Sequence, residues 1–418
     1  MTQPFTLANF NVRNLVPAST KSIYHYFYSV GKHNFYSAIK KEHEKQSAYE
    51  KKIGWIASQL DQMNADVVCF QEIFDLQPLQ DAINLSHYAG KCKLLMAGQA
   101  EPRETDFRGT PARVYKVPHV AIMVRSGFDV VDFEAISRMP EQCDISKTVV
   151  EESGRTWAIE LNESGEQFNQ FNRPVLKARI QLPDRFSRVK GEHRKAPVIT
   201  VFSAHFKSKR PIQIDDFEGS TREVTAAYLR ESAIGRARSL LLRAVEAAAL
   251  RTCVIDELAE DPDRPVFVVG DLNDGPRSVT TEVSGGLTRP IFNHHFEPDN
   301  DKREEMFHIS ADLSLYSSYH LQTLRSHRDV YYTHIFDGHH DTLDHILVSS
   351  HFVPRWVRDG KGRDNIGKAG ALRVYNDHLK DADIDDLRAS NIGKYLHTRS
   401  DHGQVTLRLD WFEHKQRQ

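Results

Sequence analysis

The stretch VFVVGDLNDGP at positions 266 to 276 joins an apolar run to a polar turn. The run consists of four apolar residues, the last two of which are β-branched valines. Such a run is typical of a strand buried on both faces. It stops at Gly270, and Asp271 and Asn273 follow at once, two residues apart. Strand ends that face one direction are where α/β sheets assemble their sites. The stretch therefore predicts a buried strand that presents an acid and an amide to a functional site.

Composition and charge are those of an ordinary globular chain. Hydrophobic residues make up 40% of the 418 positions and charged residues 27%, which is enough apolar material for a sizeable core. The 55 Lys and Arg against 57 Asp and Glu give a net charge of −2. No global basic excess therefore attracts nucleic acid or acidic lipid, although a local basic groove would suffice for a nucleic acid.

The cysteines and the N-terminus favour a cytoplasmic protein. Four cysteines are scattered without metal-ligand spacing, too few and too dispersed for a disulfide framework: Cys69, Cys92, Cys143 and Cys253. The first residues, MTQPFTLANFNV, run straight into a strand pattern without a charged-then-apolar signal region. No apolar stretch approaches the ~20 residues that cross a bilayer. We therefore expect a protein without a membrane span.

Strand and helix patterns alternate along the chain. Apolar strand patterns occur at 5–12, 65–74, 119–125, 174–182, 197–206, 265–273, 343–350 and 403–409. Apolar residues at helical spacing predict a helix over 47–64, and STRE predicts a capping box at Ser220 that opens a longer helix. Because neither a repeat nor a linker divides the chain, we expect one α/β domain over 1–418. Its insertions are expected near 16–50, 140–170 and 276–330.

Polar residues follow most of these apolar strands. A lone acid after a strand is usually a cap or turn residue, and a lone histidine among 21 is usually structural. Here the coincidence matters, because residues suited to phosphate and metal chemistry follow strand after strand. Strand ends carry Asn11, Glu72, His205, Asp271 and Asn273, and a further pair of loops supplies Asp344 and Asp401 with His402. We therefore expect them to share one site.

The oxygen donors in this set indicate a hard divalent cation. Asn11, Glu72, Asp344 and Asp401 offer the ligand atoms that Mg²⁺ or Mn²⁺ prefers. No histidine–cysteine grouping argues for zinc. Asp344 could instead fix the tautomer of a neighbouring histidine. Neither a GxSxG elbow nor a glycine-rich P-loop occurs, so serine-hydrolase and nucleotide-kinase chemistry lack their essential parts.

The ordered series NFNVRN, FQE, SAHFKS, GDLND, LDHILVS and SDHG resembles the endonuclease/exonuclease/phosphatase family. The match runs from residue 5 to about residue 409 and keeps the family's order and strand context. The resemblance implies a four-layer α/β sandwich, in which two mixed β-sheets pack face to face with helices outside. The strand and helix pattern alone suggests a single parallel sheet.

The resemblance also implies roles for individual residues. Asn11, Glu72 and Asp401 would hold the divalent cation, with Glu72 as the principal ligand. Asp271 would position or deprotonate the attacking water, and Asn273 would bind the scissile phosphate or that water.

The remaining matched residues would act on the phosphate. His402, oriented by Asp344, would meet a non-bridging oxygen. His205 stands where nuclease and sphingomyelinase members carry a histidine that assists the leaving group. It argues against the apurinic-site endonucleases, which carry a tyrosine near there. Arg173 and Lys207 would contact the phosphate.

Three functions remain open: a nuclease acting on DNA or RNA, a phosphatase or phosphodiesterase acting on a small or lipid phosphate, and an inactive binding module. The last is disfavoured because every matched catalytic position keeps a competent residue. HFKSK at 205–209 favours the nuclease-like members over the inositol-polyphosphate 5-phosphatases. The oligomeric state, the number of metal ions and the choice between endo- and exo-cleavage stay open.

Three further stretches have a structural and a functional interpretation. The long helix carries arginines that could follow a phosphate backbone, although such a helix face is commonly just solvated: Arg230, Arg236, Arg238, Arg243 and Arg251. The aromatic segment 24–36 could stack on nucleobases, but packing against a sheet edge is the simpler interpretation. The mixed-charge segment 40–52 predicts a solvated helix face.

Overall fold

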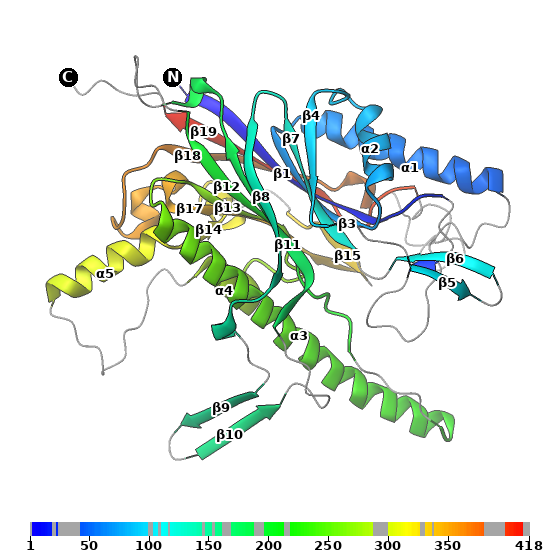
Figure 1. Ribbon diagram of the computed structural model, residues 1–418. Helices are drawn as coiled ribbons and strands as arrows, with labels where there is room; N and C mark the ends of the chain where they lie inside the picture. The colour runs from blue at the N-terminus through cyan, green and yellow to red at the C-terminus, as the bar shows by residue number, and fades with distance from the viewer. Residues whose placement is uncertain are drawn as a thin grey trace.

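Two six-stranded β-sheets packed face to face form the centre of the computed structural model (Figure 1). The structure describes residues 2–18, 22–23, 42–98, 103–107, 110–115, 118–143, 147–152, 155–160, 169–187, 196–212, 218–286, 300–326, 331–336, 338–379 and 398–412. The aromatic segment 24–36 lies outside these residues, as do parts of all three expected insertions.

The first sheet has the strand order β18-β19-β1-β3-β7-β4. Its strands are β1 (Thr2–Leu15), β3 (Val67–Ile73), β4 (Cys92–Met96), β7 (His119–Arg125), β18 (Gly367–Tyr375) and β19 (Gln404–Phe412). β1 runs parallel to β3, and the other neighbouring strands are antiparallel.

The second sheet has the order β14-β17-β13-β12-β11-β8. Its strands are β8 (Asp129–Arg138), β11 (Gln170–Gln181), β12 (Val198–His205), β13 (Val266–Asp271), β14 (Leu315–Ser317) and β17 (Asp344–Ser349). Only β12 and β13 are parallel in this sheet. Both sheets are mixed, so the four-layer sandwich is confirmed and the single parallel sheet suggested by the pattern is wrong.

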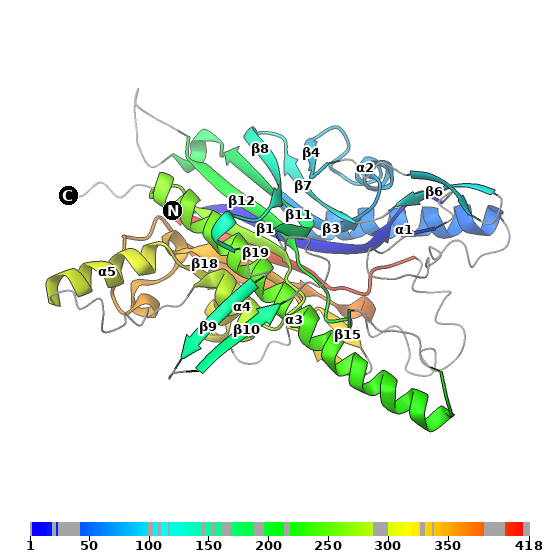
Figure 2. The same ribbon diagram turned by 60° about the horizontal axis from the view of Figure 1, so that its bottom comes forward.

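Helices cover the outer face of each sheet (Figures 1 and 2). α1 (Glu42–Met63) and α2 (Leu76–Asn84) pack on the first sheet through buried residues such as Ile56, Leu60 and Leu79. α3 (Thr221–Glu260) packs on the second sheet through residues of its C-terminal half, among them Leu250 and Val254. The expected capping box at Ser220 is present.

The smaller elements lie around this sandwich. They are α4 (Val279–Gly285), α5 (Asn300–Asp312), α6 (Ser318–Thr323), β2 (Ser22–Ile23), β5 (Arg103–Phe107), β6 (Thr110–Tyr115), β9 (Lys147–Glu152), β10 (Arg155–Glu160), β15 (His334–Phe336) and β16 (His339–Asp341). Within the expected insertion 276–330, β14 pairs with β17 and extends the second sheet. No helix in the described part of the chain is long and apolar enough to cross a bilayer.

The inner faces of the strands change from apolar to polar at one end of the sandwich. On β1, Phe5 and Leu7 belong to the core between the sheets, and period-two alternation puts Asn9 and Asn11 on the same face. On β13, Phe267 and Val269 lead in the same way to Asp271. His205 follows apolar inner-face residues at the end of β12, and Asp344 precedes Ile346 and Val348 at the start of the antiparallel β17. A polar site is thereby placed at the end of the inter-sheet core.

Candidate active site

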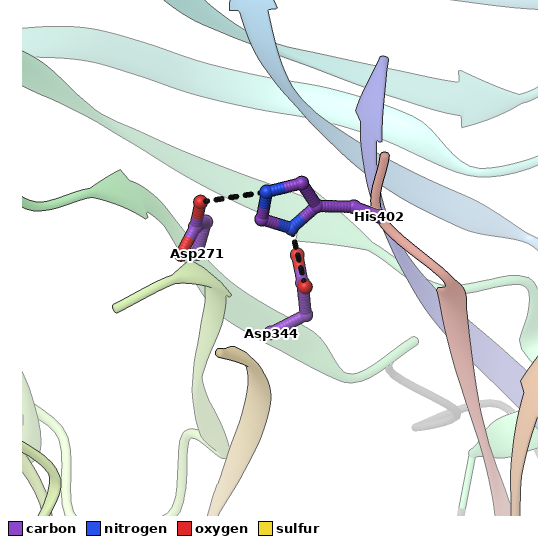
Figure 3. A group of neighbouring side chains, drawn as sticks. All are labelled: Asp271, Asp344 and His402. Carbon is purple, nitrogen blue, oxygen red and sulfur yellow. Dashed lines mark hydrogen bonds and ion pairs between the residues drawn. The ribbon is translucent and has the colours of Figure 1, made fainter. Parts of the chain in front are cut away.

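Asp271, Asp344 and His402 form the centre of the polar end of the sandwich. The imidazole of His402 lies between the two carboxylates (Figure 3), with Nδ1 2.8 Å from Asp344 Oδ2 and Nε2 3.8 Å from Asp271 Oδ2. Asp271 and Asp344 face each other in the antiparallel pairing of β13 with β17. The three side chains are buried, so their interactions are little screened by water.

Hydrogen bonds from the surrounding chain fix the orientation of Asp344. Its Oδ1 accepts from Asn9 Nδ2 at 2.8 Å, and its main-chain N–H donates to Thr333 Oγ1 at 3.2 Å. His402 is fixed separately, because its main-chain N–H donates to Ser400 Oγ, which in turn donates to the carbonyl of Asn11. Asp344 and His402 are thus aligned by both sheets.

Burial and charge set the protonation of this centre. Burial is the main cause that raises the pKa of Asp271 to about 7, while the neighbouring His402 acts to lower it. Burial alone would lower the pKa of His402, but the carboxylates of Asp344 and Asp271 outweigh it and hold that pKa well above its usual value. The structure therefore favours a cationic His402 beside a carboxyl group that titrates near neutral pH.

Asp271 Oδ2 is shared by three nitrogen atoms. Asn11 Nδ2 donates to it at 3.1 Å, His205 Nε2 lies at 3.6 Å and His402 Nε2 at 3.8 Å. The two imidazoles, far apart in the sequence, therefore meet at one carboxylate oxygen. The other oxygen, Oδ1, accepts the main-chain N–H of Asn273 at 2.9 Å. Asn273 has a φ of +54° and donates its side-chain amide to the carbonyl of Phe206 at 3.0 Å.

Glu72 reaches the site through a break in strand geometry. Phe70 faces helix α1, and regular alternation would send Glu72 the same way. Instead Glu72 has a φ of +65°, and the pairing of β3 with β7 is irregular between Phe70 and Ile73. Such a conformation costs on the order of 1–3 kcal/mol in a non-glycine residue. The bend brings Glu72 Oε1 to 3.3 Å from Asn11 Nδ2.

Asp401 joins the same network through Arg13. Arg13 Nε lies 3.3 Å from Asp401 Oδ2, and the main-chain N–H of Arg13 donates to Asn11 Oδ1 at 2.9 Å. The next residue, Asn14, donates its main-chain N–H to Glu72 Oε2 at 2.8 Å. The turn at Arg13 and Asn14, near the end of β1, therefore touches all three residues expected to hold the cation.

The donor chemistry of Asn11, Glu72 and Asp401 fits a hard divalent cation. Asp401 Oδ1 is buried and has no hydrogen-bond partner among the described residues, as expected of an oxygen meant for a ligand. The most compact group of His, Asp and Glu ligands in the described chain is instead Asp271, Asp344 and His402, within 4.8 Å. Within this group, Asp344 and His402 already bond each other.

Arg173 and Lys207 lie beside the site, and both are buried. Arg173 donates to the carbonyl of Phe206 at 2.8 Å, and Lys207 Nζ to the carbonyls of Ser208 and Arg210. Burial is the main cause that lowers the pKa of Lys207 to about 7, and the Arg173 guanidinium adds to it. The two side chains are thus held by main-chain oxygens at the end of the second sheet.

The buried carboxylate of Glu246 on α3 anchors the main chain next to these two cations. It accepts the N–H of Asn172 at 2.9 Å and the N–H of Lys207 at 2.7 Å. Arg243, one turn away, is buried and donates to the carbonyl of Lys207. The interpretation of Arg243 as part of an outer arginine face is therefore wrong, whereas Arg230, Arg236 and Arg238 are exposed.

Several residues of the site escaped the sequence interpretation. Asn9 had a usable signal, because it precedes Asn11 by two positions and must share its strand face. His334 had no such signal. The centroid of its ring lies 5.0 Å from that of His402. Burial is the main cause that lowers the pKa of His334 to about 4, and the charge of His402 adds to it. Lys52, expected on a solvated face, is buried, and the interpretation of segment 40–52 is wrong at this position.

A family model described as "Endonuclease/Exonuclease/phosphatase family" matches residues 52–402. No curated protein matches the chain. Solved structures with a similar fold include a family protein from Bacteroides thetaiotaomicron, at 13% identity, 99% coverage of both chains and a TM-score of 0.42. A mannosyl-6-phosphatase from the same organism has 12% identity, covers 97% of this chain and 99% of its own, and has a TM-score of 0.44. The human nocturnin catalytic domain has 14% identity, 98% and 95% coverage, and a TM-score of 0.41.

Proposed function

The chain belongs to the endonuclease/exonuclease/phosphatase family of phosphoesterases, and on this basis we propose that it is a divalent-metal-dependent nuclease. The observation that carries the proposal is the single carboxylate oxygen of Asp271, which faces Asn11 and the imidazoles of His205 and His402. A carboxylate flanked by two imidazoles suits the transfer of protons to and from a reacting phosphate.

Asn11, Glu72 and Asp401 would hold the cation, with Glu72 as the principal ligand. When bound, the cation would neutralise the negative charge that develops on the phosphate oxygens while the leaving group is displaced. Family members generally depend on divalent metals, and the oxygen donors of this site favour Mg²⁺ or Mn²⁺.

Asp271 would accept the proton of the attacking water. Its raised pKa of about 7 matches the task, because a general base is most effective when its pKa lies near the working pH. Asn273, held at the same turn by its bond to Asp271, would orient that water or a phosphate oxygen.

The imidazoles would stabilise the two kinds of oxygen that become negative. His402, kept cationic by Asp344 and Asp271, would donate from Nε2 to a non-bridging oxygen. His205 would protonate the leaving oxygen as its bond to phosphorus breaks. Arg173 and Lys207 would contact the phosphate at the end of the second sheet.

The proposal of a nucleic-acid substrate rests on the exposed arginines of α3, which lie on the part of the helix that leads away from Arg243 and Glu246 beside the site. The net charge of −2 is the observation that favours the alternative, a phosphatase or phosphodiesterase for a small or lipid phosphate. Both substrates would use the same centre, so the experiment must compare them directly.

The test is to incubate the chelator-treated and the Mg²⁺- or Mn²⁺-supplemented protein with plasmid, single-stranded DNA, RNA and a panel of phosphate esters. We expect hydrolysis of a polynucleotide that disappears in EDTA and returns with either cation. Full activity in chelator would contradict the metal site. Hydrolysis confined to small or lipid esters would replace the nuclease by the alternative function.

A further inference from the structure

Lys52 is a buried lysine that the proposed mechanism does not use. It lies on α1 with 1% of its surface exposed, and its Nζ donates to the carbonyl of Arg13 at 2.5 Å. Lysine is almost never fully buried unless its ammonium group is satisfied. Here the acceptor is a main-chain oxygen in the turn that Arg13 and Asn14 make near the end of β1, where the pairing with β3 is irregular.

That turn has an unusual backbone. Arg13 and Asn14 are consecutive non-glycine residues with φ of +53° and +45°. The left-handed region is disfavoured for residues with a Cβ, so the surrounding structure must hold both residues there. The bond from Lys52 to the carbonyl of Arg13 is a direct restraint on the peptide that joins them.

The same turn supplies main-chain donors to the expected metal ligands. Arg13 N–H binds Asn11 Oδ1 and Asn14 N–H binds Glu72 Oε2, while the Arg13 side chain reaches Asp401. A change in the direction of this turn would therefore alter the orientation of Asn11, Glu72 and Asp401 together.

We propose that Lys52 is a positioning residue for the metal ligands, acting through the left-handed turn Arg13–Asn14 that it holds in place. The inference rests on the proposed function, because it takes Asn11, Glu72 and Asp401 as the ligands. Groups behind metal ligands are typically worth about 10- to 100-fold in metal affinity. Lys52 stabilises cation binding by geometry, although its own charge opposes a second cation nearby.

These two effects have opposite signs, which makes the role measurable. Loss of a positioning bond weakens cation binding, whereas loss of a nearby positive charge strengthens it. Lys52→Met removes both the bond and the charge while keeping an unbranched side chain. Lys52→Arg keeps the charge and the ability to donate to the Arg13 carbonyl. Lys51→Met, at the adjacent exposed position, is the matched control.

The experiment is a Mn²⁺ titration of each variant, with free Mn²⁺ measured by electron paramagnetic resonance and no substrate present. We expect Lys52→Met to weaken binding about 10- to 100-fold, Lys52→Arg to restore most of it, and Lys51→Met to match the wild type. Equal or tighter binding by Lys52→Met would overturn the inference and leave the proposed function standing. A wild type that binds no Mn²⁺ would overturn both.

A second measurement covers the case in which Lys52→Met folds poorly. The rise in melting temperature on adding Mn²⁺ reports binding to the folded state alone. Lys52→Gln, a milder variant, should show a smaller rise than the wild type at the same Mn²⁺ concentration. A rise equal to that of the wild type would contradict the positioning role.

Discussion

At the scale of single residues, the site depends on atoms shared between side chains from distant parts of the sequence. Asn9 and Asn11 of the first sheet donate to Asp344 and Asp271 of the second, so each of these proposed catalytic carboxylates is bonded across the sandwich. Their residue types and strand-end positions could be predicted from the sequence. The hydrogen bonds that join these side chains could not be predicted, because they depend on how the two sheets are packed.

Asp344→Asn tests the proposed Asp344–His402 pair. The amide can still accept from Asn9, but it presents a donor or a weak acceptor to His402 Nδ1 and so disturbs the tautomer. We expect kcat to fall by about 10²- to 10⁴-fold. The melting temperature should fall, because the substitution leaves the buried cationic His402 without its closest carboxylate. Steady-state kinetics and thermal unfolding measure the two effects.

The control for this variant is Asp341→Asn, on the neighbouring strand β16. Asp341 is a half-exposed partner of Lys209 at 3.2 Å, and it lies outside the group formed by Asp271, Asp344 and His402. Its substitution should leave kcat unchanged. A wild-type kcat in Asp344→Asn would contradict the proposal that Asp344 orients His402.

At the scale of elements, the sequence predicted the strands that are buried and missed those that are not. β8 is paired only on one side and is mostly exposed, so its sequence shows no apolar run. β18 contains Gly367 and Gly370, where a Cβ would meet the carbonyls of Asp410 and Arg408 at 2.6 and 2.7 Å. The bend at Glu72 also left no signal, because nothing in FQE distinguishes a left-handed glutamate from a regular one.

Gly270→Ala tests whether the close approach of β12 and β13 positions the site. A Cβ at Gly270 would lie 2.0 Å from the carbonyl oxygen of Ala204, which is main chain and cannot rotate away. The strands must separate next to His205 and Asp271. We expect a loss of about 1–3 kcal/mol in stability, as for other overpacked sites, together with a fall in kcat.

Urea unfolding and kinetics of this variant should be compared with those of Gly275→Ala, five residues further along the chain in the loop after β13. A Cβ there meets nothing within 4 Å, so stability and rate should stay close to the wild type. If Gly270→Ala were as stable and active as the control, the close approach of the strands would have no part in placing the two side chains.

At the scale of the whole molecule, α3 is longer than the sheet it covers. No residue of 221–234 is buried, and this N-terminal third of the helix extends beyond the sandwich in both views (Figures 1 and 2). The sequence predicted the helix and its cap but not this projection, since the arginine pattern continues into the buried half. The packed half begins near Ser239 and carries Arg243 and Glu246 toward the site.

The projecting arm predicts a dependence on salt. If the substrate is a nucleic acid, Arg230 on the projecting segment and Arg236 and Arg238 just beyond it are exposed cations that would neutralise phosphates beyond the scissile bond. Replacing all three by Gln should weaken binding to duplex DNA. It should also make the slope of log K against log salt less steep by about 0.9 for each phosphate that the variant no longer neutralises. Turnover of a small phosphate ester should not change.

Fluorescence anisotropy with labelled DNA at several salt concentrations measures this slope, with a catalytically impaired background such as Asp344→Asn to prevent cleavage. A charge-matched control replaces Lys368, Arg373 and Arg408, which are exposed on β18 and β19 of the other sheet, by Gln. An equal loss in both triple variants would mean that charge in general, and not the arm, attracts the polymer. An unchanged slope in the α3 variant would mean that the three arginines do not contact the substrate. It would also strengthen the small-ester alternative, because the site at Asp271 would then act without an extended surface that binds phosphates.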